Sequence, residues 1–305
     1  MTTRAVVLVS GVLSHTPFTT PDAACSTGFA ASNTHTFLRQ WLLDHGITVF
    51  TAPQRTGDGP VAETDDVFDG PFGGCPVQPP ESMTVDTMAR VDLGGVRLHA
   101  FATHLHDTYG VTEIDLVGHS MGGPLSRALI GEIARVGGPV RVRSLTTIGS
   151  PWEPPMLKEF LGDDPALESP DYDIVRTFAG TLIDRRPATD AVVEQLTTGY
   201  DAWAESLAGT LDDLPVTLIG GSAFELEGGD PELWPNDGAI QLVAATGENV
   251  PARLLPHRTV HVLPLTHSLF VSDMAGLDPS TALTWNPQVG DIVVEALRSA
   301  GWATA

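Results

Sequence analysis

The sequence predicts an α/β fold with a mostly parallel central sheet and helices on both of its faces. Short apolar runs recur along the chain, and stretches with helical periodicity separate them. Buried parallel strands appear as runs of this kind, because both of their faces are covered. Strands that alternate with helices also favour parallel pairing, since each parallel connection must cross back over the sheet.

Six apolar runs are the predicted strands, and four periodic stretches are the predicted helices. The strands are expected over residues 5–9, 47–50, 114–117, 145–148, 216–219 and 260–265. The helices are expected over residues 34–45, 96–109, 125–136 and 289–297. A chain of 305 residues exceeds the usual length of one domain, but α/β chains build a single core of this size with an insertion.

Two segments interrupt the alternation. Residues 51–93 are rich in Gly, Pro and Asp, and we expect this segment to lie over the sheet edge or the mouth of the site. Residues 151–210 contain helical stretches at 190–196 and 202–207. We therefore expect a core made of residues 1–150 and 211–305, with residues 151–210 inserted as a helical cap or lid. The tryptophans in or near this insertion either line a cavity or serve its packing, and they are Trp152, Trp203 and Trp234.

The chain is acidic, with a formal net charge of −22 at pH 7. Nucleic acids and anionic membrane surfaces attract clustered Lys and Arg, so both are disfavoured as partners. On charge a neutral or cationic substrate fits better, although acidity also serves solubility alone. No run of about 18 apolar residues is present, which predicts that no helix spans a membrane. The first apolar run is too short for a secretory signal, so we expect a cytoplasmic protein if Met1 is the natural start, and a secreted one if a signal was removed.

The two cysteines, Cys25 and Cys75, lie in segments rich in Pro and Gly. A disulfide between them would stabilise the fold by about 4 kcal/mol in the chain-entropy description. An oxidising compartment favours this bridge, whereas a reducing cytosol favours two free thiols. Both alternatives stay open.

The strongest local signal is the segment Gly118-His119-Ser120-Met121-Gly122-Gly123, which lies between a predicted strand and a predicted helix. A Gly-x-Ser-x-Gly motif in this context places its serine on a strained turn, and the glycines prevent clashes with neighbouring backbone. The serine then lies at a helix N-terminus, where amides stabilise negative charge. This context predicts that Ser120 is a nucleophile.

With this motif the chain resembles the lipase and esterase branch of the α/β-hydrolase superfamily. The hexapeptide matches that branch residue for residue, and Thr147-Ile148-Gly149-Ser150-Pro151 resembles the turn after its next strand. The resemblance implies the α/β-hydrolase fold and the order nucleophile, acid, histidine along nearly the whole chain. It is specific for the fold and the nucleophile, and it indicates little about the substrate.

A serine hydroxyl needs a neighbouring base, and the resemblance implies a histidine after the last strand. Three histidines follow the predicted cap: His257, His261 and His267. His261 lies within the apolar run 260–265, whereas His267 follows that run in a loop. We therefore choose His267 as the general base over the other two.

The acid that orients this histidine is expected after the strand at 216–219. The segment Asn236-Asp237-Gly238-Ala239-Ile240 resembles the one that carries the acid in many lipases of this branch. We choose Asp237, and Asp230 in a second turn is the alternative.

The resemblance also implies an oxyanion hole made of two backbone amides. They would belong to Met121, after the nucleophile, and to Val12, after Gly11. The family commonly has His-Gly before the second residue, whereas this chain has Ser10-Gly11. Backbone amides carry this function, so the difference should be tolerated, but the path of residues 13–32 does not follow from the family pattern.

Together these residues predict a serine esterase or lipase that cleaves a carboxylic ester through an acyl-enzyme on Ser120. The substrate that we expect is a small neutral or apolar ester. No cofactor or metal is expected, because His99, His104 and His106 on one helical pattern lack a convincing ligand set. We expect solvated helix faces for them. Lactonases, thioesterases and acyltransferases use the same triad, and a catalytically silent binding protein of this fold is the alternative from another class.

Overall fold

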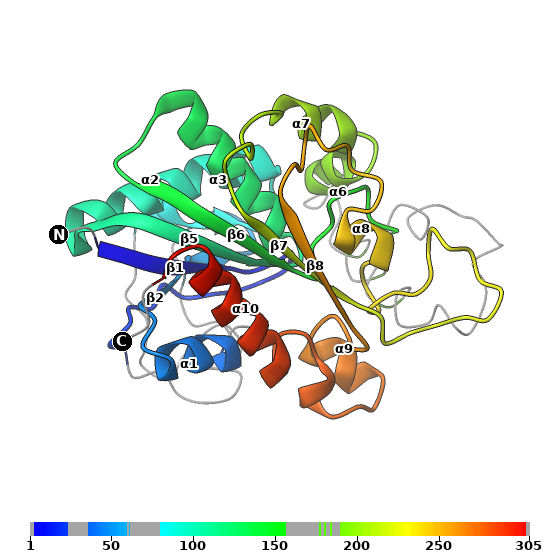
Figure 1. The fold of residues 1–305 in the computed structure, drawn as a ribbon. Coiled ribbons are helices and arrows are strands. Elements are labelled where there is room, and N and C mark those ends of the chain that lie inside the picture. Colours follow the sequence, from blue (N-terminus) through cyan, green and yellow to red (C-terminus); the bar gives the residue numbers. More distant parts are fainter. Residues whose placement is uncertain are drawn as a thin grey trace.

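The protein is described by a computed structural model in which a six-stranded parallel sheet forms the centre (Figure 1). The described residues are 3–23, 36–59, 61, 80–156, 177, 180, 184 and 190–302. The strand order is β2-β1-β5-β6-β7-β8, and every neighbouring pair is parallel. The strands are β1 (Thr3–Val9), β2 (Val49–Thr51), β5 (Val111–His119), β6 (Arg141–Ile148), β7 (Val216–Gly221) and β8 (Arg258–Leu263). All six predicted strands are confirmed, with ends that differ by a few residues.

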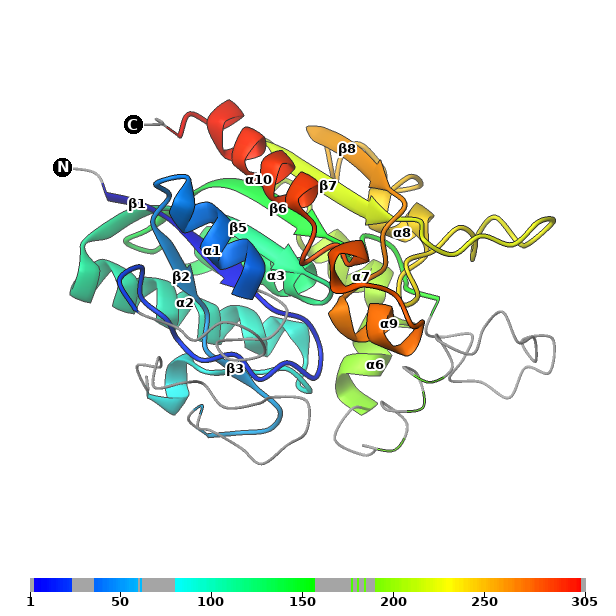
Figure 2. The ribbon, with the colours of Figure 1, turned by 90° about the horizontal axis from the view of Figure 1, so that it is seen from below.

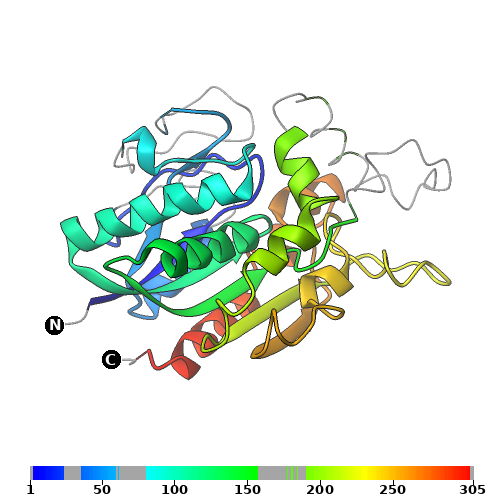
Figure 3. The ribbon, with the colours of Figure 1, turned by 90° about the horizontal axis from the view of Figure 1, so that it is seen from above.

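The two faces of the sheet are covered by two pairs of helices. The first face carries α2 (Val91–Tyr109) and α3 (Gly122–Val136), which lie in front in Figure 3. The opposite face carries α1 (Thr36–Asp44) and α10 (Pro287–Ser299), which lie in front in Figure 2. All four predicted helices are thus confirmed, and the parallel sheet is buried between two helical layers.

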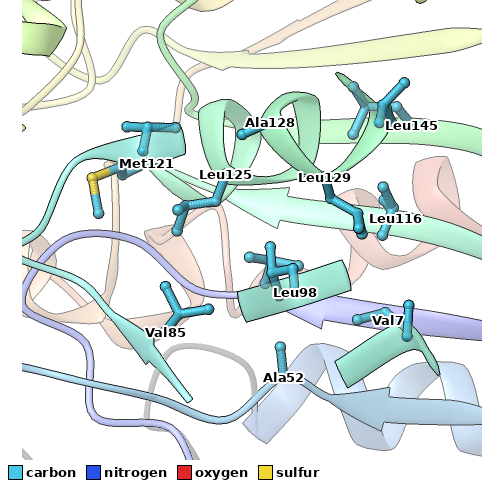
Figure 4. Packing of buried hydrophobic residues seen from close by; sticks show 14 of the residues in the cluster. Val7, Ala52, Val85, Leu98, Leu116, Met121, Leu125, Ala128, Leu129 and Leu145 are labelled. Atoms are coloured by element: carbon cyan, nitrogen blue, oxygen red, sulfur yellow. The ribbon is translucent and has the colours of Figure 1, made fainter. Parts of the chain in front are cut away.

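Each face has its own apolar core. On the first face, Leu98 of α2 and Leu125 and Leu129 of α3 lie near Val7 and Leu116 of the central strands (Figure 4). On the opposite face, buried leucines and valines of α1 and α10 join strand residues in a second cluster. The continuous apolar character of the central strands follows from this double burial.

Helix α2 begins at Val91, five residues before the position predicted from the sequence. Gly94 and Gly95 weaken the helical pattern there, because glycine has a low intrinsic helix propensity. In the structure both glycines face α3, and a Cβ on Gly95 would lie 2.7 Å from the backbone of Ala128. The close approach of α2 and α3 therefore requires glycine at positions 94 and 95, although glycine is unfavourable in a helix.

The remaining described elements are short, and most of them were not predicted. Strands β3 (Gln54–Arg55) and β4 (Val85–Asp86) form a small parallel pair within the segment predicted as a long loop. The others are α6 (Asp190–Leu196), α7 (Tyr200–Ser206), α8 (Leu242–Thr246), α9 (Leu269–Met274) and the 3-10 turns η2 (Glu81–Met83) and η5 (Pro279–Thr281). Helices α6 and α7 coincide with the helical stretches expected in the insertion, between β6 and β7.

A buried arginine of α3 connects this helix to α7. The Cζ atom of Arg127 lies 4.5 Å from the ring centroid of Trp152 and 4.8 Å from that of Trp203. Its Nη1 donates to the Tyr200 hydroxyl at 2.7 Å, and that hydroxyl donates to the carbonyl of Pro151 at 2.9 Å. Burial raises the pKa of Tyr200, which keeps its proton available for this bond. Trp152 and Trp203 therefore serve the packing of α7 against α3.

Some expectations fall on residues that the structure does not describe. Cys25 and Cys75 both lie outside the described residues, and so do most of residues 62–79 and 157–189. Across the parts of the chain that are described, no helix is both long enough and apolar enough to cross a membrane.

A buried ion pair fixes the start of β1 to the middle of the sheet. Asp115 of β5 is fully buried and accepts from Arg4 Nε at 2.6 Å and Arg4 Nη2 at 2.7 Å. Ser144 of β6 donates to the same carboxylate at 2.5 Å. Arg4 Nη1 also donates to the carbonyl of Ala300, so the Arg4 side chain connects β1 to β5 and to the end of α10, and the Asp115 carboxylate extends this link to β6.

Replacing Asp115 by alanine should lower the free energy of unfolding by about 3–5 kcal/mol, because the Arg4 charge would lose its buried partner. Urea denaturation followed by far-UV circular dichroism measures this change. The matched control is Arg253→Ala, which removes the exposed pair with Glu205 and should lower stability by less than about 1 kcal/mol. Equal losses in the two variants would contradict the role assigned to the buried pair.

Candidate active site

Ser120 lies on a sharp turn between the end of β5 at His119 and the start of α3 at Gly122. Its φ is 55°, and among the described residues the only other non-glycine with a positive φ is Leu13, at 61°. A left-handed conformation at such residues costs on the order of 1–3 kcal/mol and is concentrated at functional sites. The strain predicted for the motif serine is therefore present, and its second occurrence lies in the predicted oxyanion loop.

The two motif glycines make this turn sterically possible. A Cβ on Gly118 would lie 2.5 Å from the backbone of Gly122. A Cβ on Gly122 would clash with the carbonyl oxygen of Val9, at the end of β1. The Ser120 amide meanwhile donates to the Ile148 carbonyl at 2.9 Å, which fixes the turn to the end of β6.

The loop after β1 lies directly against Ser120. A Cβ on Gly11 would lie 2.6 Å from the Ser120 Cβ and 3.0 Å from its Oγ, so only glycine fits between them. Within the described part of the chain, the amides of Val12 and Met121 donate to no protein acceptor. Two left-handed turns thus lie against each other at Ser120, and each is next to an amide without an acceptor among the described residues.

Gln54 holds this loop in place, although sequence reasoning did not identify it. The Ser10 amide donates to Gln54 Oε1 at 2.5 Å, and Gln54 Nε2 donates to the Ser10 carbonyl at 2.9 Å. The buried side-chain amide thus bonds both backbone polar groups of Ser10, the residue that follows β1. No sequence signal marks this residue, because its role depends on a contact across 44 positions.

Asp237 and His267 form a buried pair. The Asp237 Oδ2 lies 2.8 Å from the His267 Nδ1, and their exposed fractions are 0% and 4%. A carboxylate only accepts hydrogen bonds, so Nδ1 carries the proton and the Nε2 of a neutral ring is left as a proton acceptor. The structure therefore brings together the acid and the base chosen from the sequence.

Local turns hold both members of this pair. The Asp237 Oδ1 accepts from the amides of Ala239 at 2.9 Å and Ile240 at 2.7 Å, which orients the carboxylate. The His267 amide donates to the Asp237 carbonyl at 2.7 Å. Its carbonyl accepts from the Nε2 of His119, at 2.9 Å. The base is thus tied both to the acid and to the residue beside Ser120.

The alternative residues lie elsewhere. His257 precedes β8, at the amino-terminal edge of the parallel sheet, whereas Ser120 lies at the carboxyl-terminal edge. His261 belongs to β8, and both histidines line a groove between β8 and α10. Asp230 is exposed and caps a turn through the amide of Glu232. Among the contacts of the described residues, none joins His257, His261 or Asp230 to Ser120.

The histidines of α2 do not form a metal centre. His99, His104 and His106 have intermediate exposure, so they are less solvated than expected, and the rings of Phe18 and Tyr109 pack at the edge of His104. In the described regions, no group of three or more His, Cys, Asp or Glu side chains could hold a metal ion.

Comparison with known proteins agrees with this architecture. A family model described as the alpha/beta hydrolase fold matches residues 96–222, which include the Ser120 turn. None of the curated protein sequences matches the chain.

Three solved structures have similar folds at low sequence identity. The mature form of the Bacillus licheniformis lipase BlEst2 has 14% identity and a TM-score of 0.54, and the match covers 96% of this chain and 91% of that one. A thermostable carboxyl esterase from Bacillus coagulans has 13% identity and a TM-score of 0.52, with 98% and 91% covered. The Pyrococcus furiosus esterase Pf2001 has 12% identity and a TM-score of 0.52, with 98% and 82% covered. These findings confirm the predicted resemblance to the α/β-hydrolase superfamily, and the chain has the α/β-hydrolase fold.

Proposed function

We propose that this protein is a serine hydrolase that cleaves a carboxylic ester through an acyl-enzyme on Ser120. The observation that carries the proposal is the buried Asp237–His267 pair, which is bonded to His119, the residue before a serine held in a left-handed turn. The similarity to a lipase and two esterases supports the same class of reaction. In this proposal His267 is the general base, Asp237 orients it, and the amides of Val12 and Met121 form the oxyanion hole.

The reaction has two halves. The Ser120 Oγ attacks the acyl carbon while its proton passes to Nε2 of His267, and the carbonyl oxygen takes up negative charge facing the Val12 and Met121 amides. The carbon–oxygen bond to the alcohol then breaks, and the alcohol leaves with the proton from His267. Water attacks the acyl-enzyme by the same route, releasing the carboxylic acid and returning the proton to Ser120. Asp237 holds the ring in its productive tautomer and stabilises the imidazolium.

A neutral or apolar ester is the substrate class that we propose. The formal charge of −22 disfavours anionic substrates at long range, because like charges raise the energy of encounter. Hydrolysis of a neutral ester also needs no cofactor, since nucleophile, base and oxyanion donors all come from this chain.

We also propose that residues 151–210 form a cap on the core. In support, α6 and α7 lie between two neighbouring strands in the chain order, and α7 packs through Arg127 onto α3, the helix that follows Ser120. Helix α6 contacts α2 as well, because the Val91 amide donates to Gln195 Oε1 at 2.6 Å. The cap would thus be anchored on both helices of one face.

Ser120→Ala and His267→Ala should each lower kcat/KM for p-nitrophenyl esters by about 10³-fold or more, because each removes a member of one reacting unit. A series of increasing acyl length, measured by release of p-nitrophenol, also gives the size of the acyl site. His261→Ala and Asp230→Asn are the matched controls and should keep the wild-type rate. Turnover that survives Ser120→Ala would overturn the proposal.

Gly11→Ala should lower kcat by about 10²-fold with a smaller effect on KM, because the new Cβ pushes the Val12 amide away from the oxyanion. Gly138→Ala, in an exposed turn after α3, is the matched control. Ester kinetics and the thermal midpoint are measured together for both variants. A wild-type kcat in the Gly11→Ala variant would contradict the assignment of the Val12 amide to the oxyanion hole.

A further inference from the structure

Both backbone polar groups of His267 are bonded to residues of the candidate site. Its amide donates to the carbonyl of Asp237 at 2.7 Å, and its carbonyl accepts from the His119 Nε2 at 2.9 Å. A carbonyl oxygen only accepts, so the proton of this second bond lies on Nε2 of His119. The base is therefore connected by its main chain to the acid on one side and to the neighbour of the nucleophile on the other.

His119 is itself held firmly by the sheet, so its bond can fix the position of His267. It is the last residue of β5, it pairs with Ile148 of β6, and its side chain is buried. The next residue, Ser120, is fixed by its own bond to the Ile148 carbonyl. His267, in contrast, lies in a connection between β8 and α9, outside the sheet. The His119 side chain thus links a loop residue to the rigid centre of the sheet.

The two histidine rings are also in contact. Their centroids lie 4.6 Å apart and their planes are inclined by 42°. The His119 ring therefore covers one side of the His267 ring, while Asp237 holds its Nδ1. Rotation of the base about its side-chain bonds is restricted from two directions.

We propose that His119 is a positioning residue that sets the distance between the base His267 and the nucleophile Ser120. This inference rests on the proposed hydrolase function, because it assigns a role within the same proton transfer. His119 does not touch the reacting atoms. It acts through the His267 main chain and ring. Without it, the remaining main-chain bonds of Thr266 and His267 lead to Thr281, Leu283 and Asp237 and not to the Ser120 turn. A displacement of about 1 Å is enough to cost on the order of 10²-fold in rate.

The test compares two amide replacements of His119. In His119→Gln the side-chain nitrogen reaches the place of the imidazole Nε2, so the bond to the His267 carbonyl is kept. In His119→Asn the amide nitrogen corresponds to Nδ1 and is too short to make that bond. We expect His119→Asn to lower kcat for a p-nitrophenyl ester by about 10²-fold with KM nearly unchanged, and His119→Gln to retain most of the wild-type kcat.

Two further measurements separate positioning from stability. The rate at which a fluorophosphonate labels Ser120 should fall in His119→Asn in parallel with kcat, because labelling needs the same base. The thermal midpoint of both variants is recorded beside it, and a destabilised variant is assayed well below its midpoint. The proposal is overturned if His119→Asn and His119→Gln both keep the wild-type kcat. Equal losses of kcat in the two variants would overturn it as well.

The activity of the wild-type protein separates a failure of this proposal from a failure of the proposed function on which it rests. If the wild type hydrolyses esters and Ser120→Ala does not, the proposed function stands, and only the comparison of the His119 variants decides on the positioning role. If the wild type hydrolyses no ester and its Ser120 is not labelled, the proposed function fails first, and the role of His119 fails with it.

Discussion

The left-handed turn at Ser120 is the constraint on which the candidate site depends. A non-glycine residue keeps this conformation only where its surroundings exclude the alternatives. Here the Ser120 amide is bonded to the Ile148 carbonyl, and α3 begins two residues later. A side chain at position 118 would clash with the backbone of Gly122, and one at position 122 would clash with the end of β1, so glycine is required at both positions. The hydroxyl is consequently held at the carboxyl-terminal edge of the sheet, at the start of a helix, where developing negative charge is stabilised.

The parallel sheet explains how the other residues reach this turn. In a parallel sheet the carboxyl ends of all strands lie at one edge, and ligands of open α/β sheets bind there. Val12 follows β1, Ser120 follows β5, and Asp237 and His267 follow β7 and β8. The Asp237 carbonyl and the His119 side chain each bond the main chain of His267, and the His119 bond joins the last of these loops to the centre of the sheet. The geometry of the candidate site is thus fixed by backbone groups as much as by its side chains.

Two arginines, Arg4 with little exposure and Arg127 buried, connect distant parts of the chain, and their charges are stabilised in different ways. Arg4 pairs with the carboxylate of Asp115, so its charge is balanced within the sheet. Arg127 is sandwiched between indole rings and bonded to the Tyr200 hydroxyl, so its charge is stabilised by aromatic faces. The first pair holds the core together, and the second set of contacts holds α7 to the helix that follows Ser120.

The sequence by itself determined the elements and the residue types of the site. The strands were predicted because burial on both faces leaves uninterrupted apolar runs, and Ser120 because its motif combines a strand, a turn and a helix. Asp237 and His267 were chosen by resemblance to a family, since no local pattern distinguishes them from Asp230 or His261. Only the tertiary structure decided that Asp237 and His267 meet, that Gly94 and Gly95 belong inside α2, and that Gln54 bonds Ser10 and His119 bonds His267. Each of these features depends on contacts between residues far apart in the chain. Local periodicity and turn residues do not predict such contacts.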